Sequence, residues 1–252
     1  MRRSPNGGAL KHKTSKDLEA LRAGYQKGQE TRERILNAAL KAFGDASFLA
    51  VTTRQIAGAA SVSLPTLQYH FGDKEGLYRA CAEAIVERYR RQMKPAGAQA
   101  AEALGGNCSA EAARALLGAL MRALAGFLVG SSEAGRWAQF VARELRDPGP
   151  AFEILYAGLW RPGVEITARL ICRILGSPEG DPAARVRALL LISSLLVFQS
   201  GRNVSLRAMH WSAIGSEELA LVLAGLDAQI EAIGRTPADS GGPAVRPMRT
   251  RT

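Results

Sequence analysis

The spacing of apolar side chains predicts helices along almost the whole chain and no β-strand. Between Glu30 and Phe43, apolar residues recur every three or four positions, so they lie on one face of a helix. The same periodicity predicts a helix from about Lys74 to Met93, with one buried stripe. We therefore expect an all-α fold.

Two short helices joined by a tight turn are predicted between these longer ones. Thr52 is a favourable N-cap, and Gln55 stands three positions later, where it can complete a capping box. The second short helix has Ser63 as its N-cap and Pro65 in its first turn, and Gly72 ends it. The pattern predicts a helix-turn-helix, whose second helix enters the major groove of DNA.

The second half of the chain is also predicted to be helical. Lys94–Cys108 contains Pro95 and several glycines, so we expect a loop there. The helices expected after it run from Ser109 to Val129, from Ser131 or Ser132 to Arg146, from Ala151 to Leu175 with a kink or a break at Pro162, from Asp181 to Arg207, and from Ser216 to Ile233.

Four regions follow from this pattern. We expect a flexible basic arm over residues 1–28, a three-helix DNA-binding domain over 29–75, a helical domain over 76–233, and a disordered tail over 234–252. The net charge is +10, and much of the excess lies in the two ends. The arm is either a DNA contact or a solvated tail, so the DNA assignment depends on the motif.

The sequence gives little support for a disulfide-stabilised, metal-binding or membrane protein. The three cysteines, Cys81, Cys108 and Cys172, are far apart and form no CxxC pair, which favours buried thiols in a reducing cytoplasm. The three histidines have no metal-ligand spacing, and we expect no metal and no cofactor. No apolar run is long enough to predict a membrane span.

The motif offers side chains of two kinds to DNA. Thr52 and Thr53 present hydroxyls and free N–H groups to a phosphate, and Arg54 is long enough to reach a guanine edge. On the second helix, polar groups suited to base edges alternate with apolar groups suited to a thymine methyl. The remaining predicted DNA-binding residues are Ser63, Leu64, Pro65, Thr66, Gln68, Tyr69, His70 and Lys74.

Residues 59–77 (AASVSLPTLQYHFGDKEGL) resemble the TetR family of bacterial repressors. The family pattern has a Thr-x-x-x-Ile-Ala segment, a Tyr-x-His-Phe-like end and a Lys-x-x-Leu segment. Ser61 occupies a turn position that the family usually gives to Gly, and Gln68 stands where an aromatic residue is usual. The resemblance implies a DNA-binding regulator in which Gln68 redirects base reading.

Residues 140–152 (FVARELRDPGPAF), followed by Leu155-Tyr156 and Arg161-Pro162, resemble the CecR-like branch of that family. The resemblance implies an all-helical C-terminal domain that dimerises and senses a small molecule. Members of the branch often control drug-export genes.

Aromatic and polar residues before and after the Pro162 break are candidates for the ligand site. The alternative is a helical core with one internal ion pair. The candidates are Trp137, Phe140, Arg143, Glu144, Phe152, Tyr156, Trp160 and Gln199. Two stretches, Ala188–Phe198 and Leu219–Ile230, are apolar enough to be buried on more than one side, so they predict a four-helix dimer interface.

The sequence thus predicts a cytoplasmic, homodimeric repressor that reads a palindromic operator in double-stranded DNA and is released by a small molecule. One alternative is a sequence-indifferent DNA binder that depends on its basic ends. A second is an enzyme using Glu144, although no nucleophile–base pair or phosphate loop supports it.

Overall fold

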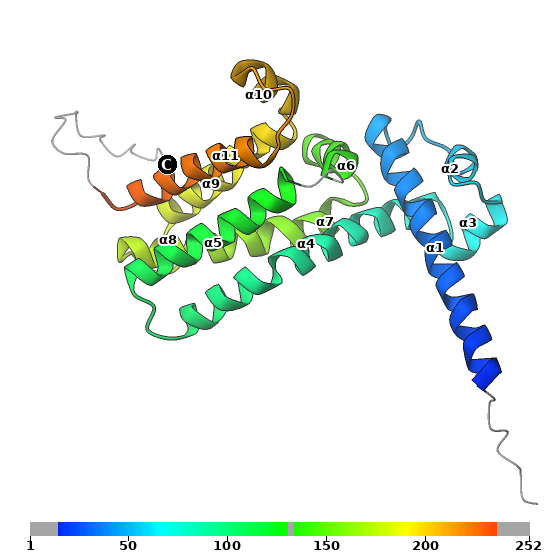
Figure 1. Ribbon diagram of the computed structural model, residues 1–252, viewed down its shortest axis with the longest axis horizontal. Helices are drawn as coiled ribbons and strands as arrows, with labels where there is room; N and C mark the ends of the chain where they lie inside the picture. Colours follow the sequence, from blue (N-terminus) through cyan, green and yellow to red (C-terminus); the bar gives the residue numbers. More distant parts are fainter. Residues whose placement is uncertain (1–14, 131–133, 236–252) are drawn as a thin grey trace, which may run out of the picture. The chain divides into compact units, whose positions relative to one another are not determined.

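The computed structural model describes residues 15–130 and 134–235, and throughout them the chain is helical without a strand (Figure 1). The all-α prediction is confirmed. In chain order the elements are α1 (Ser15–Asp45), α2 (Thr53–Ala59), α3 (Leu64–Phe71), α4 (Lys74–Gly105), α5 (Ala110–Leu128), α6 (Ala134–Arg146), α7 (Phe152–Leu155), the π-helix η1 (Tyr156–Trp160), α8 (Arg161–Leu175), α9 (Pro182–Gln199), α10 (Arg202–Met209) and α11 (Ser216–Ala232).

The chain forms two compact units, which differ from the four expected regions. Unit 1 comprises the chain up to Arg88 together with Gly135–Ala157, and unit 2 comprises Tyr89–Ala134 and the chain from Gly158 on. Unit 1 therefore contains α1–α3, the first part of α4, and α6–α7. We expected α6 and α7 in the C-terminal domain, but they pack with the helix-turn-helix because Glu144 and Phe140 of α6 contact Tyr78 of α4.

The first helix is longer than expected. We predicted a flexible arm up to residue 28, but α1 is already helical at Ser15. The segment contains good helix formers and no proline, and nothing in it ends a helix before Gly44-Asp45. The rest of the expected arm, residues 1–14, and the expected tail after Arg235 lie outside the described residues.

The fourth helix also continues where a loop was expected. α4 runs through Pro95 to Gly105, so the prediction of a loop from Lys94 was wrong. A proline inside a helix costs about 3 kcal/mol. Here the alanine-rich segment after Pro95 favours helix, and the buried residues Met93, Ala100 and Leu104 anchor the turns on both sides of it.

Two breaks divide the later helices. Before Pro162 the backbone forms the π-helix η1, because proline cannot donate to the carbonyl four residues earlier. The expected interruption of Ala151–Leu175 is therefore present. The helix expected from Asp181 to Arg207 is broken at Ser200-Gly201 into α9 and α10. The expected caps Ser131 and Ser132 lie outside the described residues.

In unit 2, α8 packs against α5 and α9, and α11 packs against α5 (Figure 1). Buried side chains such as Leu117, Leu170 and Leu195 form the core. The ion pair between Arg122 and Asp227, at 2.9 Å, also joins α5 to α11. By length and composition alone, α9 could cross a membrane. Inside the structure, 22% of its residues are buried.

Candidate DNA-binding site

The N-terminus of α2 is held by the predicted capping box. The N–H of Gln55 donates to Oγ1 of Thr52 at 3.3 Å, and the N–H of Thr52 donates to Oε1 of Gln55 at 2.8 Å. Ile56 and Ala57 are buried, so α2 is anchored by its inner face. Arg54 is exposed and Thr53 is half-buried. The cap and anchor leave Arg54 on the outer face, where a long cationic side chain can reach a base edge.

The turn between α2 and α3 contains a residue in the left-handed region. Ser61 has φ 53°, which a side chain with a Cβ adopts only at a cost. The N–H of Ser61 donates to the carbonyl of Gly58 at 3.1 Å, and that of Val62 donates to the carbonyl of Ala57 at 3.0 Å. The turn therefore keeps the tight geometry expected of a glycine, although Ser61 stands in its place.

The recognition helix α3 begins at a cap of the expected kind. Oγ of Ser63 accepts from the N–H of Thr66 at 3.2 Å, and the two hydroxyl oxygens lie 2.8 Å apart. Leu67 is fully buried and anchors the helix. On the outer face, Gln68 is exposed and Tyr69 is 86% exposed. An anchored helix with two exposed polar side chains matches the geometry for groove reading.

The other predicted contact residues of this motif differ in their exposure to solvent. Ser63 and Pro65 are exposed, whereas Leu64, Thr66 and His70 are half-buried. The hydroxyls of Ser63 and Thr66 already form a hydrogen bond with one another. A contact from either hydroxyl to DNA must therefore be made while this bond is kept.

Lys74 has partners inside unit 1 that the sequence did not indicate. Its Nζ donates to the carbonyl of Leu49 at 3.4 Å and lies 4.7 Å from the centre of the Phe48 ring. Arg32 lies in a similar way over Phe71, 5.2 Å from the ring centre. Both cations thus hold the helix-turn-helix together by cation–π contact. Nothing in the local sequence pattern pairs these residues, because they come from separate elements.

A buried polar hub joins α6 to α4. The hydroxyl of Tyr78 donates to Oε1 of Glu144 at 2.5 Å, and the N–H of Gly149 donates to Oε2 at 3.1 Å. Glu144 is only 2% exposed and Tyr78 only 1%. Burial, together with the adjacent carboxylate of Glu144, raises the pKa of the Tyr78 phenol, so the hydroxyl stays protonated.

Close packing surrounds this hub. The Tyr78 ring makes edge contacts with Phe43 and Phe48, at centroid distances of 4.8 and 4.9 Å, and lies 4.7 Å from Phe140. At Gly149 a Cβ would lie 2.7 Å from Oε1 of Glu144, so only glycine fits without a shift. We conclude that the hub fixes the α6–α7 turn against α4.

Arg143 makes a second connection within unit 1. Its Nη2 donates to the carbonyl of Gly44 at 3.0 Å, at the end of α1. We predicted that Arg143 and Glu144 line a ligand cavity, and this stays a prediction. Both oxygens of Glu144 accept hydrogen bonds within unit 1, whereas Nε of Arg143 is buried without a hydrogen-bond partner among the described residues.

The predicted ligand-binding residues divide between the two units. Trp137 and Phe140 are buried in unit 1, where Phe152 and Tyr156 stack at 6.1 Å between ring centres. Trp160 and Gln199 belong to unit 2. Nε2 of Gln199 is buried and has no hydrogen-bond partner in the described chain. Six of the eight predicted residues thus lie in unit 1, and two lie in unit 2.

Comparison with known proteins identifies both parts of the chain. The model for "Bacterial regulatory proteins, tetR family" matches residues 35–81. The model for "HTH-type transcriptional dual regulator CecR, C-terminal domain" matches residues 113–235. The chain is 29% identical to the dual regulator CecR of Shigella flexneri over 198 residues, which cover 78% of this chain and 87% of that protein.

Solved structures show the same fold. A TetR-like regulator from Rhodococcus sp. RHA1 has a TM-score of 0.55 at 18% identity, covering 80% of this chain and 94% of the other. SmeT, solved as a complex with triclosan, has a TM-score of 0.54 at 20% identity, covering 86% of this chain and all of SmeT.

Proposed function

Because the chain belongs to the TetR family of bacterial, DNA-binding transcription regulators, we propose that it is a homodimeric repressor of a palindromic operator. The observation that carries the proposal is the recognition helix α3, anchored by buried Leu67 and presenting Gln68 and Tyr69 to solvent. Each subunit reads one half-site, and the two recognition helices are separated by about 34–36 Å or a near multiple.

Base reading is assigned to side chains of α2 and to the start and outer face of α3. Arg54 matches the two acceptors of a guanine, and Gln68 matches the donor–acceptor edge of an adenine. Ser63 and Thr66 suit base edges, and Leu64 and Pro65 suit a thymine methyl.

Phosphates are assigned to residues at the helix ends. Thr52 and Thr53 bind a phosphate at the N-terminus of α2, and Tyr69, His70 and Lys74 donate to phosphates.

Exposed apolar side chains support dimerisation through unit 2. α9 buries Ala188, Leu191 and Leu195 on one face while large apolar groups stand open on another. Such a surface indicates a protein partner, and α9 and α11 from two copies would form a four-helix bundle. The exposed group comprises Val186, Leu189, Leu190, Val197, Val204, Met209 and Leu221, and we call it the apolar face.

Release by a small molecule is the third part of the proposal. In unit 2 the hydroxyl of Thr167 is fully buried without a hydrogen-bond partner among the described residues, as is Nε2 of Gln199. Unpaired buried polar groups are costly, and a ligand that bonds to them lowers that cost. SmeT, with the same fold, was solved with the small molecule triclosan. We assign the effector contacts of this chain to unit 2.

A gel-shift assay on the DNA upstream of the protein's own gene tests the operator claim. The purified full chain should shift one palindromic fragment at least 100-fold more tightly than a scrambled fragment of equal length, at about 0.15 M salt, since specific and non-specific binding commonly differ by 10³ or more. Equal affinity for both fragments would reject a sequence-specific repressor and favour a binder that depends on its basic ends.

A further inference from the structure

Unit 2 contains a cavity of about 510 Å³, open to solvent, at the C-terminal end of α11. This volume is in the range typical of small-molecule sites. Its lining comes from the end of α8, the first turns of α9 and the last residues of α11. The lining residues are Leu175, Arg187, Leu190, Leu191, Gln229, Ala232, Ile233, Gly234 and Arg235.

The lining combines apolar side chains with positive charge. Leu191 is buried, and Leu175 and Ile233 are half-buried, so they supply a surface for an apolar ligand body. Arg187 and Arg235 are exposed and supply two guanidinium groups, while no acidic side chain belongs to the lining. An apolar surface with cations at its edge is complementary to an amphipathic anion.

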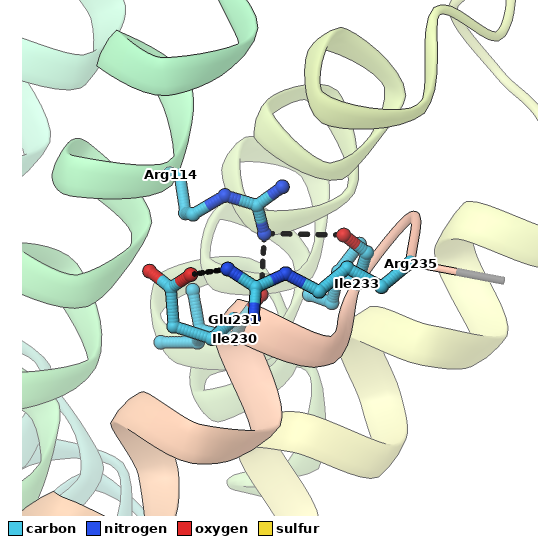
Figure 2. A network of polar contacts seen from close by, with 5 residues as sticks. All are labelled: Arg114, Ile230, Glu231, Ile233 and Arg235. Carbon is cyan, nitrogen blue, oxygen red and sulfur yellow. Dashed lines mark hydrogen bonds and ion pairs between the residues drawn. The ribbon is translucent and has the colours of Figure 1, made fainter. Parts of the chain in front are cut away.

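The wall formed by the end of α11 is held in place from outside the cavity. Nη1 of Arg114 donates to the carbonyl of Ile230 at 2.7 Å and to that of Ile233 at 3.1 Å (Figure 2). Gly234 then turns with φ 79°, and a Cβ there would contact Leu175 at 3.5 Å. The wall is therefore preformed, and a preformed site does not pay an ordering cost when a ligand binds.

The two cations differ in availability. Figure 2 shows that Arg235 is paired with Glu231, at 2.8 Å, so a carboxylate already stands beside its charge. Arg187 forms no ion pair with any carboxylate in the described chain. The cavity thus carries one uncompensated positive charge beside its apolar lining, which suits a monoanion.

We propose that this cavity binds an amphipathic monocarboxylate. The apolar body of the ligand packs on Leu175, Leu191 and Ile233, and its carboxylate forms a charge-assisted, bidentate pair with Arg187. Gln229, which also belongs to the lining, offers its amide to the same ligand. This site is separate from the effector contacts assigned above to Thr167 and Gln199, and binding to it requires no DNA.

Leu190 connects this cavity with the apolar face, because it belongs to both and is 66% exposed. In the dimer proposed above, the second copy covers the apolar face, so the cavity lies at the edge of that interface. The alternative is that the second copy fills the cavity itself. Charge distinguishes the two occupants, because a second copy would contact chiefly the leucines, whereas a carboxylate would contact Arg187.

Isothermal titration of the full chain with octanoate, and with octanamide as the uncharged probe of matching size, tests the proposal. Octanoate should bind about 3- to 5-fold more tightly, because only the carboxylate pairs with Arg187, which is exposed. Arg187→Gln should weaken octanoate binding by a similar factor and should abolish the preference over octanamide. Arg185→Gln, an exposed arginine of α9 outside the lining, should leave binding unchanged.

A second variant separates loss of the site from loss of folding. Ala232 is exposed at the cavity, so Ala232→Phe fills the space without disturbing the core and should abolish octanoate binding at an unchanged melting temperature. Equal binding of octanoate and octanamide, or full binding by Arg187→Gln, would overturn the proposal. So would an Arg187→Gln chain whose self-association changes while its octanoate affinity does not, because the second copy then occupies the cavity.

Discussion

The α2–α3 surface and the apolar face of unit 2 are both exposed, but they expose opposite chemistry. In α2 and α3 the buried groups are few, such as Ile56 and Leu67, and the outer face carries Arg54, Gln68 and Tyr69. In α9 the exposed groups are leucines and valines. The first surface is suited to aimed hydrogen bonds, and the second to burial against another apolar surface.

This contrast implies different responses to salt. Association through phosphates weakens steeply as salt rises, because bound counterions must be displaced. Association through leucines does not, because the hydrophobic effect involves no charge. The residues around the motif, from Gln29 to Glu75, carry no net positive charge. We therefore expect the orientation of a few polar groups to matter more for operator binding than the overall charge of unit 1.

The largest expected effect comes from placing a charge on the apolar face. Leu189→Glu should raise the dimer dissociation constant by about 100- to 1000-fold, because each interface would bury an unpaired carboxylate. Analytical ultracentrifugation without DNA measures this directly. Leu49→Glu is the matched control, since Leu49 is 87% exposed in unit 1 and should leave self-association unchanged. A dimer that survives Leu189→Glu would contradict the assignment of this face.

The next effect tests how much the buried hub contributes to the stability of unit 1. Tyr78→Phe removes the donor to Glu144 and should lower the free energy of unfolding by about 1.5–3 kcal/mol, the range for bonds to charged groups. Urea denaturation gives the value. Tyr25→Phe, at a 70% exposed tyrosine of α1, is the control and should change stability by less than about 0.5 kcal/mol.

The same hub predicts a pH dependence. The pKa of Tyr78 is raised in the folded state, so the unfolded chain loses this proton first, at about pH 10. The stabilisation is complete below that pH and decreases as pH rises above it. Tyr78→Phe should show a smaller loss of stability between about pH 10 and pH 11 than the unaltered chain does. Equal losses in both chains would mean that the raised pKa makes no contribution.

Substitutions in the helix-turn-helix should change operator affinity by a free energy similar to, or smaller than, the stability change expected for Tyr78→Phe. Gln68→Ala should cost about 1–3 kcal/mol of operator affinity and relax specificity at one position of each half-site. Thr53→Ala should weaken binding to all sequences alike, because a phosphate contact carries no base information. Gel shifts on operators altered at single positions distinguish the two. If Gln68→Ala keeps the full discrimination, another side chain reads that position.

The smallest expected effect is stabilising. Ser61 has φ 53°, a region in which glycine has no steric penalty, so Ser61→Gly should raise the free energy of unfolding by up to about 1 kcal/mol. Ser63→Gly is the matched substitution two positions later. It removes the N-cap of α3 and should be slightly destabilising. The opposite signs, measured by urea denaturation, would separate a strained turn from a capping residue.

The DNA-binding motif was predictable from the sequence because its interactions are local. The cap of Thr52 and Gln55 and the cap of Ser63 each involve residues three positions apart. The helix end at Gly72 depends on the conformational preference of a single residue. These features can be deduced without any knowledge of the remaining chain, and the structure places them as expected. The left-handed conformation of Ser61 could not be deduced in this way, because serine disfavours positive φ and the turn imposes it.

Only the tertiary structure determined the role of α6 and the extent of two helices. Tyr78 and Glu144 lie 66 positions apart, and Arg143 lies 99 positions from Gly44, so no sequence pattern pairs them. Composition placed Arg143 and Glu144 among the ligand-site candidates, but it could not show that Glu144 is hydrogen-bonded to Tyr78. The helix through Pro95 likewise depends on buried residues on both sides of it, because packing energy can exceed a local penalty.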